Sequence, residues 1–211
     1  MRIVFISDTH GQHSSLLLPE GDMIIHAGDF TSKGTAAQVN DFLYWFKKLP
    51  FRYKIFIGGN HDFLLEEKPD QFREMLLPDF IYLEDSMVEI EGIKIWGSPI
   101  TPYFFNWAFN RQRGEDIRRY WNMIPEGIDV LVTHGPPYGI LDTTARGEVV
   151  GCKDLTDRIN ETRPRIHVFG HIHEAYGQVQ GEHTLFINAS CADLKYRMVN
   201  APVVVELGMK N

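Results

Sequence analysis

The stretch Ile3-Val-Phe-Ile6, followed at once by Ser7-Asp-Thr-His-Gly11, decides the fold, because an unbroken apolar run ends in a polar cluster. Four further apolar runs end in the same way, at residues 23–25, 54–57, 130–132 and 166–169. Apolar runs without alternation predict strands that are buried on both faces. The polar clusters would then meet at the carboxyl ends of these strands, where α/β proteins bind their ligands.

Helical patterns and hairpins separate these strands. Helical spacing of apolar residues and flanking prolines predict helices at residues 35–49, 70–77, 114–123 and 154–162. Short runs around turn residues predict antiparallel hairpins at residues 87–96 and 178–187, and residues 203–207 are expected to close a sheet. The combination indicates a mixed α/β fold with more than one sheet. Because no break in composition divides the chain, we expect one domain over residues 1–211.

The composition excludes several classes of protein. The 211 residues carry a net charge of −7, with 44% hydrophobic and 23% charged side chains, which is typical of a folded globular protein. The acidic balance argues against a long nucleic-acid duplex as partner, because such binders place many basic side chains on phosphates. We see no signal peptide before the first strand, no apolar run as long as a membrane span, and no zinc motif around the two cysteines. We therefore expect a cytoplasmic protein without a membrane partner, and leave its oligomeric state open.

Five of the nine histidines lie in the polar clusters: His10, His61, His134, His171 and His173. They are accompanied by Asp8, Asp29, Asn60 and Asp62. Each cluster alone could be a structural turn, but a structural protein has no reason to end five buried strands in this way. Residues two apart in an extended segment face the same side, so Asp8 and His10 could hold one metal ion, as could the pair His171 and His173. Carboxylate, imidazole and amide ligands without thiolate favour Mn²⁺, Fe or Zn²⁺.

The ordered clusters resemble the motifs of the calcineurin-like metallophosphoesterases: Asp8-x-His10, Gly28-Asp29, Gly59-Asn-His-Asp62, Thr133-His134 and Gly170-His-x-His173. The resemblance implies a four-layer αββα sandwich, in which two mixed β-sheets are flanked by helices. It also implies a pair of divalent metal ions, with Mn²⁺ as the expected ion. The implied ligands of the first ion are Asp8, His10, Asp29 and His173. Those of the second are Asp29, Asn60, His134 and His171, so that Asp29 bridges.

A narrower resemblance concerns the metallophosphoesterase-domain-containing (MPPED) branch. It rests on Trp107-Ala-Phe-Asn-Arg111, Trp121-x-x-Ile-Pro125, Thr133-His-Gly-Pro-Pro137 and Asn188-Ala-Ser190. This branch includes phosphodiesterases of cyclic nucleotides, and some animal members have Gly where this chain has His171. The resemblance therefore implies a complete second metal site here. The Ser/Thr protein phosphatases differ, because their Gly-Asn-His motif continues with Glu where this chain has Asp62.

We expect a metal-dependent phosphodiesterase that hydrolyses small diesters such as 2′,3′- or 3′,5′-cyclic nucleotides, by attack of a hydroxide held between the metal ions. The resemblance implies that His61 assists the leaving oxygen and that Asp62 orients His61. Phe30, Trp107 and Arg111 are the expected substrate contacts, because aromatic rings stack on bases and Arg pairs with phosphate. The alternatives are a phosphomonoesterase or nuclease with the same centre, and a non-catalytic scaffold of this fold. His26 and His167 either support the site by hydrogen bonds or are ordinary core histidines.

Overall fold

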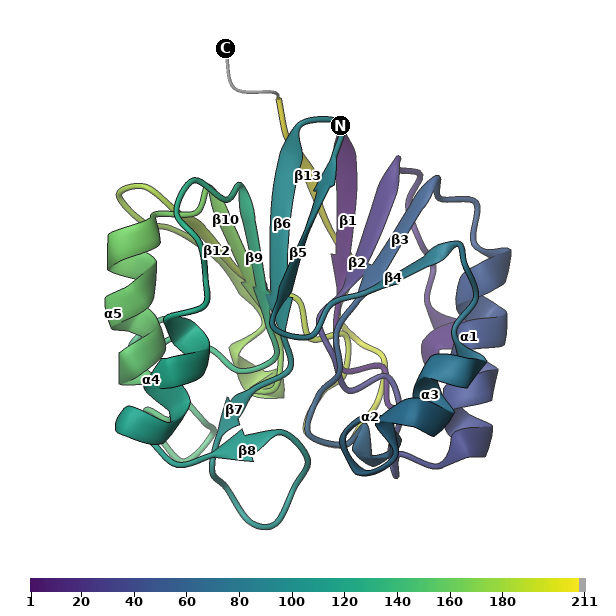
Figure 1. Cartoon of the computed structure of the whole chain (residues 1–211), viewed down its shortest axis with the longest axis horizontal. Helices are drawn as coiled ribbons and strands as arrows, with labels where there is room; N and C mark the ends of the chain where they lie inside the picture. The colour runs from purple at the N-terminus through teal and green to yellow at the C-terminus, as the bar shows by residue number, and fades with distance from the viewer. Residues whose placement is uncertain (209–211) are drawn as a thin grey trace.

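Two β-sheets form the centre of the computed structural model, which describes residues 1–208 (Figure 1). The strand order of the first sheet is β13-β1-β2-β3-β4. Four of its strands run parallel: β1 (Arg2–Ile6), β2 (Met23–His26), β3 (Tyr53–Phe56) and β4 (Phe80–Tyr82). The edge strand β13 (Val203–Glu206) pairs antiparallel with β1, which confirms that residues 203–207 close a sheet.

The second sheet has the order β11-β12-β10-β9-β6-β5. Its parallel strands are β12 (Leu185–Asn188), β10 (Ile166–Phe169), β9 (Val130–Thr133) and β6 (Ile93–Ser98). Its antiparallel edges are β11 (Gly177–Gln180) and β5 (Ser86–Ile90), each the hairpin partner of its neighbour as predicted. A separate short pair, β7 (Thr101–Pro102) and β8 (Asn110–Arg111), lies below the sheets in Figure 1. Both main sheets are therefore mixed.

Helices cover the outer face of each sheet (Figure 1). On the side of the first sheet lie α1 (Ala36–Lys48), α2 (Phe63–Glu67) and α3 (Pro69–Met75). On the side of the second sheet lie α4 (Glu115–Trp121) and α5 (Lys153–Thr162). Two 3-10 turns complete the elements, η1 (His13–Ser15) and η2 (His173–Ala175). The longest helix among residues 1–208 has 13 residues, so none of the described helices can cross a membrane.

Alternating side chains of the central strands divide the core into layers. In β1, Ile3 and Phe5 pack in one cluster with residues of both sheets, such as Ile25 and Val130. The intervening side chains, of which Val4 is one, face a second cluster that contains the apolar sides of the helices. Both faces of the central strands β1, β2, β9 and β10 are thus buried, which is why their apolar runs show no alternation. The predicted four-layer sandwich of two mixed sheets between helices is confirmed.

The helix predictions differ from the structure mainly at their ends and in the shortest elements. Thr35 is the N-cap of α1, where its hydroxyl accepts a hydrogen bond from the backbone N–H of Gln38. The predicted helix over residues 70–77 begins one residue earlier, at Pro69, and ends at Met75. Neither α2 nor β4 was predicted, because elements of five and three residues are too short to show a periodic pattern.

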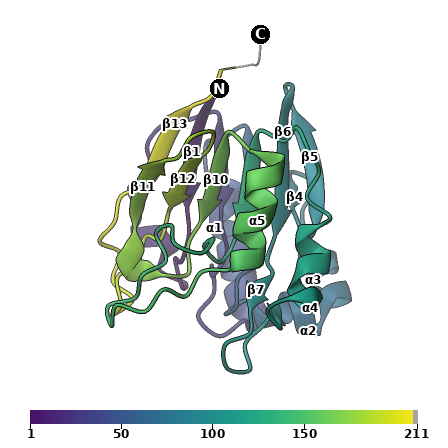
Figure 2. The same cartoon turned by 90° about the vertical axis from the view of Figure 1, so that its left-hand side faces the viewer.

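The carboxyl ends of the parallel strands of both sheets lie at one edge of the molecule. A single bridge between Ser7 and Ser190 joins the loop after β1 to the loop after β12 at this edge. Figure 2 shows the N-terminus, where β1 begins, at the opposite edge. All the predicted polar clusters follow parallel strands, so they gather in the loops at the bridged edge.

Candidate metal centre

The loop after β1 is bent into a turn by its pairing with the loop after β2. Backbone N–H groups of Asp8, His10 and Gly11 donate to carbonyl oxygens of residues 28–30 at 2.9–3.0 Å. Both Asp8 (φ 54°) and His10 (φ 44°) adopt left-handed backbone conformations. The prediction that an extended segment aligns these two side chains is therefore wrong. The turn brings them together instead, at the cost of backbone strain that is common at functional sites.

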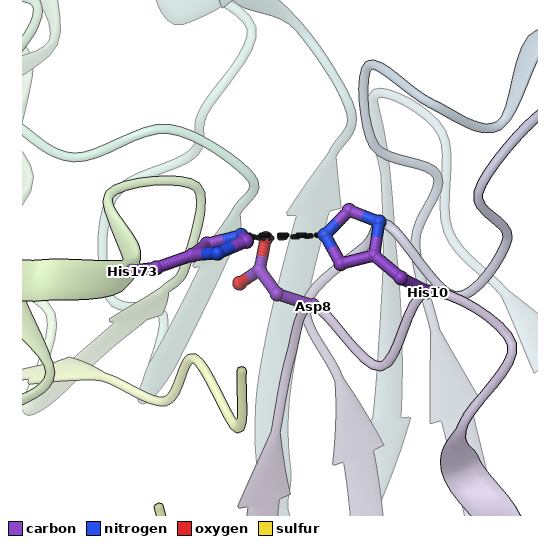
Figure 3. Close-up of side chains that lie close together, drawn as sticks. All are labelled: Asp8, His10 and His173. Atoms are coloured by element: carbon purple, nitrogen blue, oxygen red, sulfur yellow. Dashed lines mark hydrogen bonds and ion pairs between the residues drawn. The ribbon is translucent and has the colours of Figure 1, made fainter. Parts of the chain in front are cut away.

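The first group of possible ligands consists of Asp8, His10 and His173 (Figure 3). The two imidazole Nε2 atoms lie 3.3 Å apart, and Asp8 Oδ1 lies 3.4 Å from that of His173 and 4.0 Å from that of His10. The Nδ1–H of His173 donates to the backbone oxygen of Asp193 at 3.0 Å. This hydrogen bond fixes the ring so that Nε2 faces the Asp8 carboxylate, the orientation found in metal-binding histidines.

The second group consists of Asp29, His134 and His171, and Asn60 lies beside it. His134 Nε2 is 3.3 Å from Asp29 Oδ2 and 2.9 Å from Asn60 Oδ1. The Nδ1–H of His134 donates to the backbone oxygen of Ala27 at 2.8 Å, so Nε2 again faces the other candidate ligands. The ring of His171 lies 5.1 Å from that of His134. His171 and His173 thus belong to different groups, although we predicted that an extended segment would align them; His171 has a φ of 68°.

Asp29 lies between the two groups. Its Oδ2 atom is 3.3 Å from His134 Nε2 and 3.9 Å from His10 Nε2. Its Oδ1 atom accepts a hydrogen bond from the backbone N–H of His61 at 2.7 Å. Asp29 is therefore the one carboxylate that reaches both ligand groups described here, which is the geometry that a bridging ligand requires.

Two glycines let the loops approach this closely. A Cβ atom on Gly59 would lie 2.3 Å from Asp29 Oδ1, and one on Gly170 would lie 2.0 Å from Asp8 Oδ2. Both distances are impossible for real atoms, so any side chain would displace a candidate ligand. The glycines in the predicted Gly-Asn-His-Asp and Gly-His-x-His motifs are thus required by close packing against carboxylates.

The electrostatics of the centre suit bound cations. Burial would raise the pKa values of Asp8 and Asp29, but His173 and His134 respectively outweigh burial and hold both carboxyl pKa values low. Burial would likewise lower the imidazole pKa values of these histidines, but the same two carboxylates raise both to about 9. Two buried carboxylates thus depend on nearby positive charge. Oxygen and nitrogen ligand atoms without sulfur, directed toward one another, fit a pair of divalent cations, which would take the place of the protons on these imidazoles.

His61 lies beside the first group, but Asp62 does not orient it. The rings of His61 and His10 are 4.9 Å apart, and His61 Nδ1 lies 3.1 Å from the backbone oxygen of Ser32. The Asp62 carboxylate instead accepts hydrogen bonds from the backbone N–H groups of Asp29, Thr31 and Gly59 at 2.8–2.9 Å. The predicted contact between Asp62 and the His61 ring is therefore wrong, because Asp62 folds back to join the Asp29 and Asn60 loops.

The predicted substrate contacts have different outcomes. The ring of Trp107 lies 4.9 Å from that of His61, at the edge of the centre. Phe30 is fully buried and stacks on Phe42 at 4.1 Å, so its prediction as a substrate contact is wrong. Arg111 pairs with Glu66 at 2.9 Å and donates to the Tyr120 hydroxyl, so its charge is already neutralised within the protein. The geometry thus supports Trp107 alone among these residues.

Two buried histidines support the loops of the centre. His26 accepts a hydrogen bond from the backbone N–H of Gly28 and donates to Thr9 Oγ1 at 3.0 Å. His167 lies 2.8 Å from Thr133 Oγ1, next to His134. Burial lowers the pKa of both imidazoles to about 3. Both therefore act as neutral hydrogen-bonding residues behind the ligands, in agreement with the first of the two interpretations that the sequence left open.

The loop after β12 also supports the centre, and no motif in the sequence predicted it. Asp193 accepts hydrogen bonds from the backbone N–H groups of Lys195 and Arg197 and pairs with the Arg197 guanidinium. This loop positions the Asp193 carbonyl for His173 and holds the Tyr196 ring 4.7 Å from that of His10. Tyr196 has a φ of 59°, and its backbone oxygen accepts from Gln12. In the sequence, residues 193–197 are recognisable only as a short polar segment, which does not reveal that they support His173 and His10.

Comparison with known proteins agrees with this geometry. Residues 1–175 match the family model of the calcineurin-like phosphoesterases. The chain is 40% identical to human metallophosphoesterase domain-containing protein 1, over 98% of this chain and 71% of that protein. It is 38% identical to UPF0046 protein T07D4.2 of Caenorhabditis elegans, over 98% of this chain and 60% of that protein. The crystal structure of TT1561 from Thermus thermophilus has the same fold, with a TM-score of 0.63, 14% identity, and coverage of 89% of this chain and 88% of that one.

Proposed function

This chain belongs to the calcineurin-like phosphoesterase family, and we propose that it is a metal-dependent phosphodiesterase for small diesters, with 2′,3′- or 3′,5′-cyclic nucleotides as the substrate class. One observation carries the proposal: two groups of oxygen and nitrogen ligands meet at Asp29, with the imidazole of His61 beside them. A phosphoryl group bound there would lie within reach of both ligand groups and of a proton donor.

The ligands proposed for the first divalent ion are Asp8, His10, Asp29 and His173. Those proposed for the second are Asp29, Asn60, His134 and His171. When bound, such a pair of cations supplies Lewis acidity toward the phosphoryl oxygens and lowers the pKa of water. We propose Mn²⁺ as the ion, with Fe or Zn²⁺ as the alternatives, because oxygen and imidazole nitrogen without thiolate suit all three.

We assign the proton transfer to His61. The Nδ1–H of His61 donates a hydrogen bond to the backbone oxygen of Ser32, so Nε2 is the ring atom available to the substrate. In its doubly protonated form His61 would donate the Nε2 proton to the departing ester oxygen, which turns a poor alkoxide leaving group into an alcohol. Asp62 contributes indirectly, since its carboxylate fixes the backbone of the loops that carry Asp29 and His61.

The walls of the centre favour an ester with an organic substituent. Trp107 lies 4.9 Å from the His61 ring, and Tyr196 lies 4.7 Å from the ring of His10. Aromatic rings on two sides can stack against a flat group attached to the phosphate. A phosphate ester of a small alcohol would leave these rings without a partner, so this arrangement favours a substrate with a flat organic group.

The direct test is a metal-reconstituted screen with Mn²⁺, Fe²⁺ and Zn²⁺. It should include 2′,3′- and 3′,5′-cyclic nucleotides, a panel of phosphomonoesters, and bis(p-nitrophenyl) phosphate. We expect turnover of the diesters to exceed that of the monoesters. A preference for monoesters would replace the proposal by a phosphomonoesterase, and no turnover with any metal would indicate the scaffold alternative.

Substitution of His61 by Gln separates proton transfer from metal binding. We expect kcat to fall about 10²–10⁴-fold, the usual contribution of a general acid, while metal content stays unchanged. Metal content is measured by mass spectrometry after gel filtration. Loss of metal would show that His61 is a ligand, as its place in a third possible group with His10 and Asp29 allows.

Asp29→Ala removes the proposed bridge. We expect the variant to lose both ions and nearly all activity, because Asp29 reaches both ligand groups. The same metal analysis and the diester assay provide the readout. Full activity of this variant in a metal-replete state would contradict a centre with two ions.

A further inference from the structure

We propose that a pocket beside His171 binds a flat, uncharged ring carried by the ester group that stays on phosphorus during hydrolysis. The pocket has a volume of about 200 Å³ and is formed by three loops that are far apart in the sequence. This inference rests on the proposed phosphodiesterase function and deepens it, because it names the recognised part of the substrate.

The position of the pocket relates it to the proposed centre. His171 forms part of its wall and also belongs to the ligand group of Asp29 and His134. His61 lies at the other ligand group, beside His10. A diester bound between the two groups would therefore have its leaving oxygen at His61 and its second ester substituent at the pocket.

The chemistry of the walls points to a ring. The apolar lining consists of Pro102, Tyr103, Phe104, Pro136, Val150 and Ile172. Tyr103 is 51% exposed and Phe104 is 54% exposed, although each could gain stability by burial. Contiguous exposed apolar side chains beside a pocket are typical of binding sites. The Phe104 ring also lies 5.7 Å from that of Trp107, which connects this pocket to the aromatic wall beside His61.

The size and charge of the pocket limit what can enter it. Its 200 Å³ is below the range of about 300–1,000 Å³ that drug-sized ligands occupy, so it suits one ring system rather than a whole nucleotide. Glu148 contributes to the lining and would repel a further phosphate. Arg113 also contributes, but its guanidinium donates to the backbone oxygens of Val150 and Gly151 and so holds the wall. An uncharged ring, such as a nucleobase or an aryl group, fits these limits.

The test uses three diesters of p-nitrophenol that differ only in the second ester group: methyl, phenyl and thymidine 5′-yl. All three release the same leaving group, so differences in kcat/KM report the retained group. We expect the metal-loaded protein to prefer both ring-bearing esters to the methyl ester. The comparison of phenyl with thymidine distinguishes an aryl pocket from a nucleobase pocket.

Phe104→Ala removes one wall of the pocket. We expect kcat/KM to fall about three- to tenfold for the ring-bearing esters, as for the loss of one aromatic contact, and to change little for the methyl ester. Val150→Phe is the second variant, which fills the pocket and should select against the same two esters. Tyr44→Ala is the control, because Tyr44 is an aromatic side chain of 64% exposure on α1 and is not part of the pocket wall.

The outcomes separate this inference from the proposed function. Absence of turnover of all three diesters by the metal-loaded protein would contradict the phosphodiesterase function itself, and the pocket assignment would fail with it. Turnover without a preference for ring-bearing esters would contradict the proposed role of the pocket but leave the phosphodiesterase function standing. An equal loss on all three esters in Phe104→Ala and Val150→Phe would do the same, because the side chains would then act on the centre as a whole.

Discussion

Gly170 has no room for a side chain, because the Asp8 carboxylate occupies the space beside its Cα. Asp8 is fully buried and accepts hydrogen bonds from the backbone N–H of His171 at 3.0–3.1 Å. A Cβ on Gly170 would lie 2.0 Å from Asp8 Oδ2 and 2.2 Å from Ser7 Oγ. Both neighbours are buried, so neither can move aside freely. The glycine is therefore as necessary to the proposed first ion site as the ligands are.

We predict that Gly170→Ala lowers the content of bound metal and destabilises the fold by about 1–3 kcal/mol, as overpacking of a filled site does. Metal analysis and thermal unfolding measure the two effects. Gly135→Ala is the control, since it follows His134 directly but its Cβ would meet only Thr101 and Pro102 at ordinary contact distances of 3.5 and 3.9 Å. Equal metal content in both variants would contradict the packing explanation.

The types of the site residues could be predicted from the sequence, but their partners could not. Asp, His and Asn after buried strands indicated metal ligands because the chemistry of each side chain is fixed. Whether Asp62 contacts His61 or the backbone of Asp29 depends on a pairing over 33 residues, which no local pattern records. Phe30 failed as a substrate contact for a similar reason, since only the fold shows that its ring stacks on Phe42.

At the scale of elements, the loop over residues 193–197 shows how a short segment without regular structure supports the centre. Asp193 uses its side chain to close the loop on Arg197 and its carbonyl to fix the Nδ1–H of His173. The carboxylate thus acts on the centre through the loop that it closes. A sequence pattern predicts strands and helices from periodicity, and this loop has none.

We predict that Asp193→Ala weakens binding of the metal ion proposed for Asp8, His10 and His173 by about tenfold or more, the usual effect of losing support behind a metal ligand. Titration of the metal-free protein with Mn²⁺ by calorimetry measures this affinity. Asp116→Ala removes a comparable exposed pair, that with Arg119 at 2.6 Å on α4, and should leave the affinity unchanged. An unchanged Mn²⁺ affinity in Asp193→Ala would show that the backbone carbonyl of residue 193 keeps its place without the side-chain contact to Arg197.

At the scale of the whole molecule, the centre joins the two sheets. The loops after β1, β2 and β3 carry Asp8, His10, Asp29 and Asn60, whereas those after β9 and β10 carry His134, His171 and His173. The two ligand groups described above each take members from both sheets. The mixed sheets followed from the apolar runs and hairpins, but the relative placement of the sheets depends on the bridge between Ser7 and Ser190 and on the shared core, which only the structure shows.

Global stability should also depend on pH through the two buried neutral histidines. Burial lowers the pKa of His26 and of His167 to about 3 from the ordinary value of 6.5. The unfolded chain therefore binds more protons than the folded protein between these two values, so the stabilisation is complete above pH 6.5 and is lost as the pH falls toward 3. At pH 5 the linkage amounts to about 2 kcal/mol for each histidine.

We test this with His167, because burial is the only cause of its pKa shift. Guanidinium unfolding of the metal-free protein at pH 7.5 and pH 5 gives the loss of stability on acidification. In His167→Gln we expect this loss to be smaller by about 2 kcal/mol, because Gln carries no proton into the unfolded state. The difference between the proteins cancels the contributions of His134 and His173, whose raised pKa values act in the opposite sense and are common to both. An identical pH dependence in the two proteins would contradict the lowered pKa of His167. His167 would then be protonated in the folded protein at pH 5, and Thr133 would accept its hydrogen bond from a charged imidazolium.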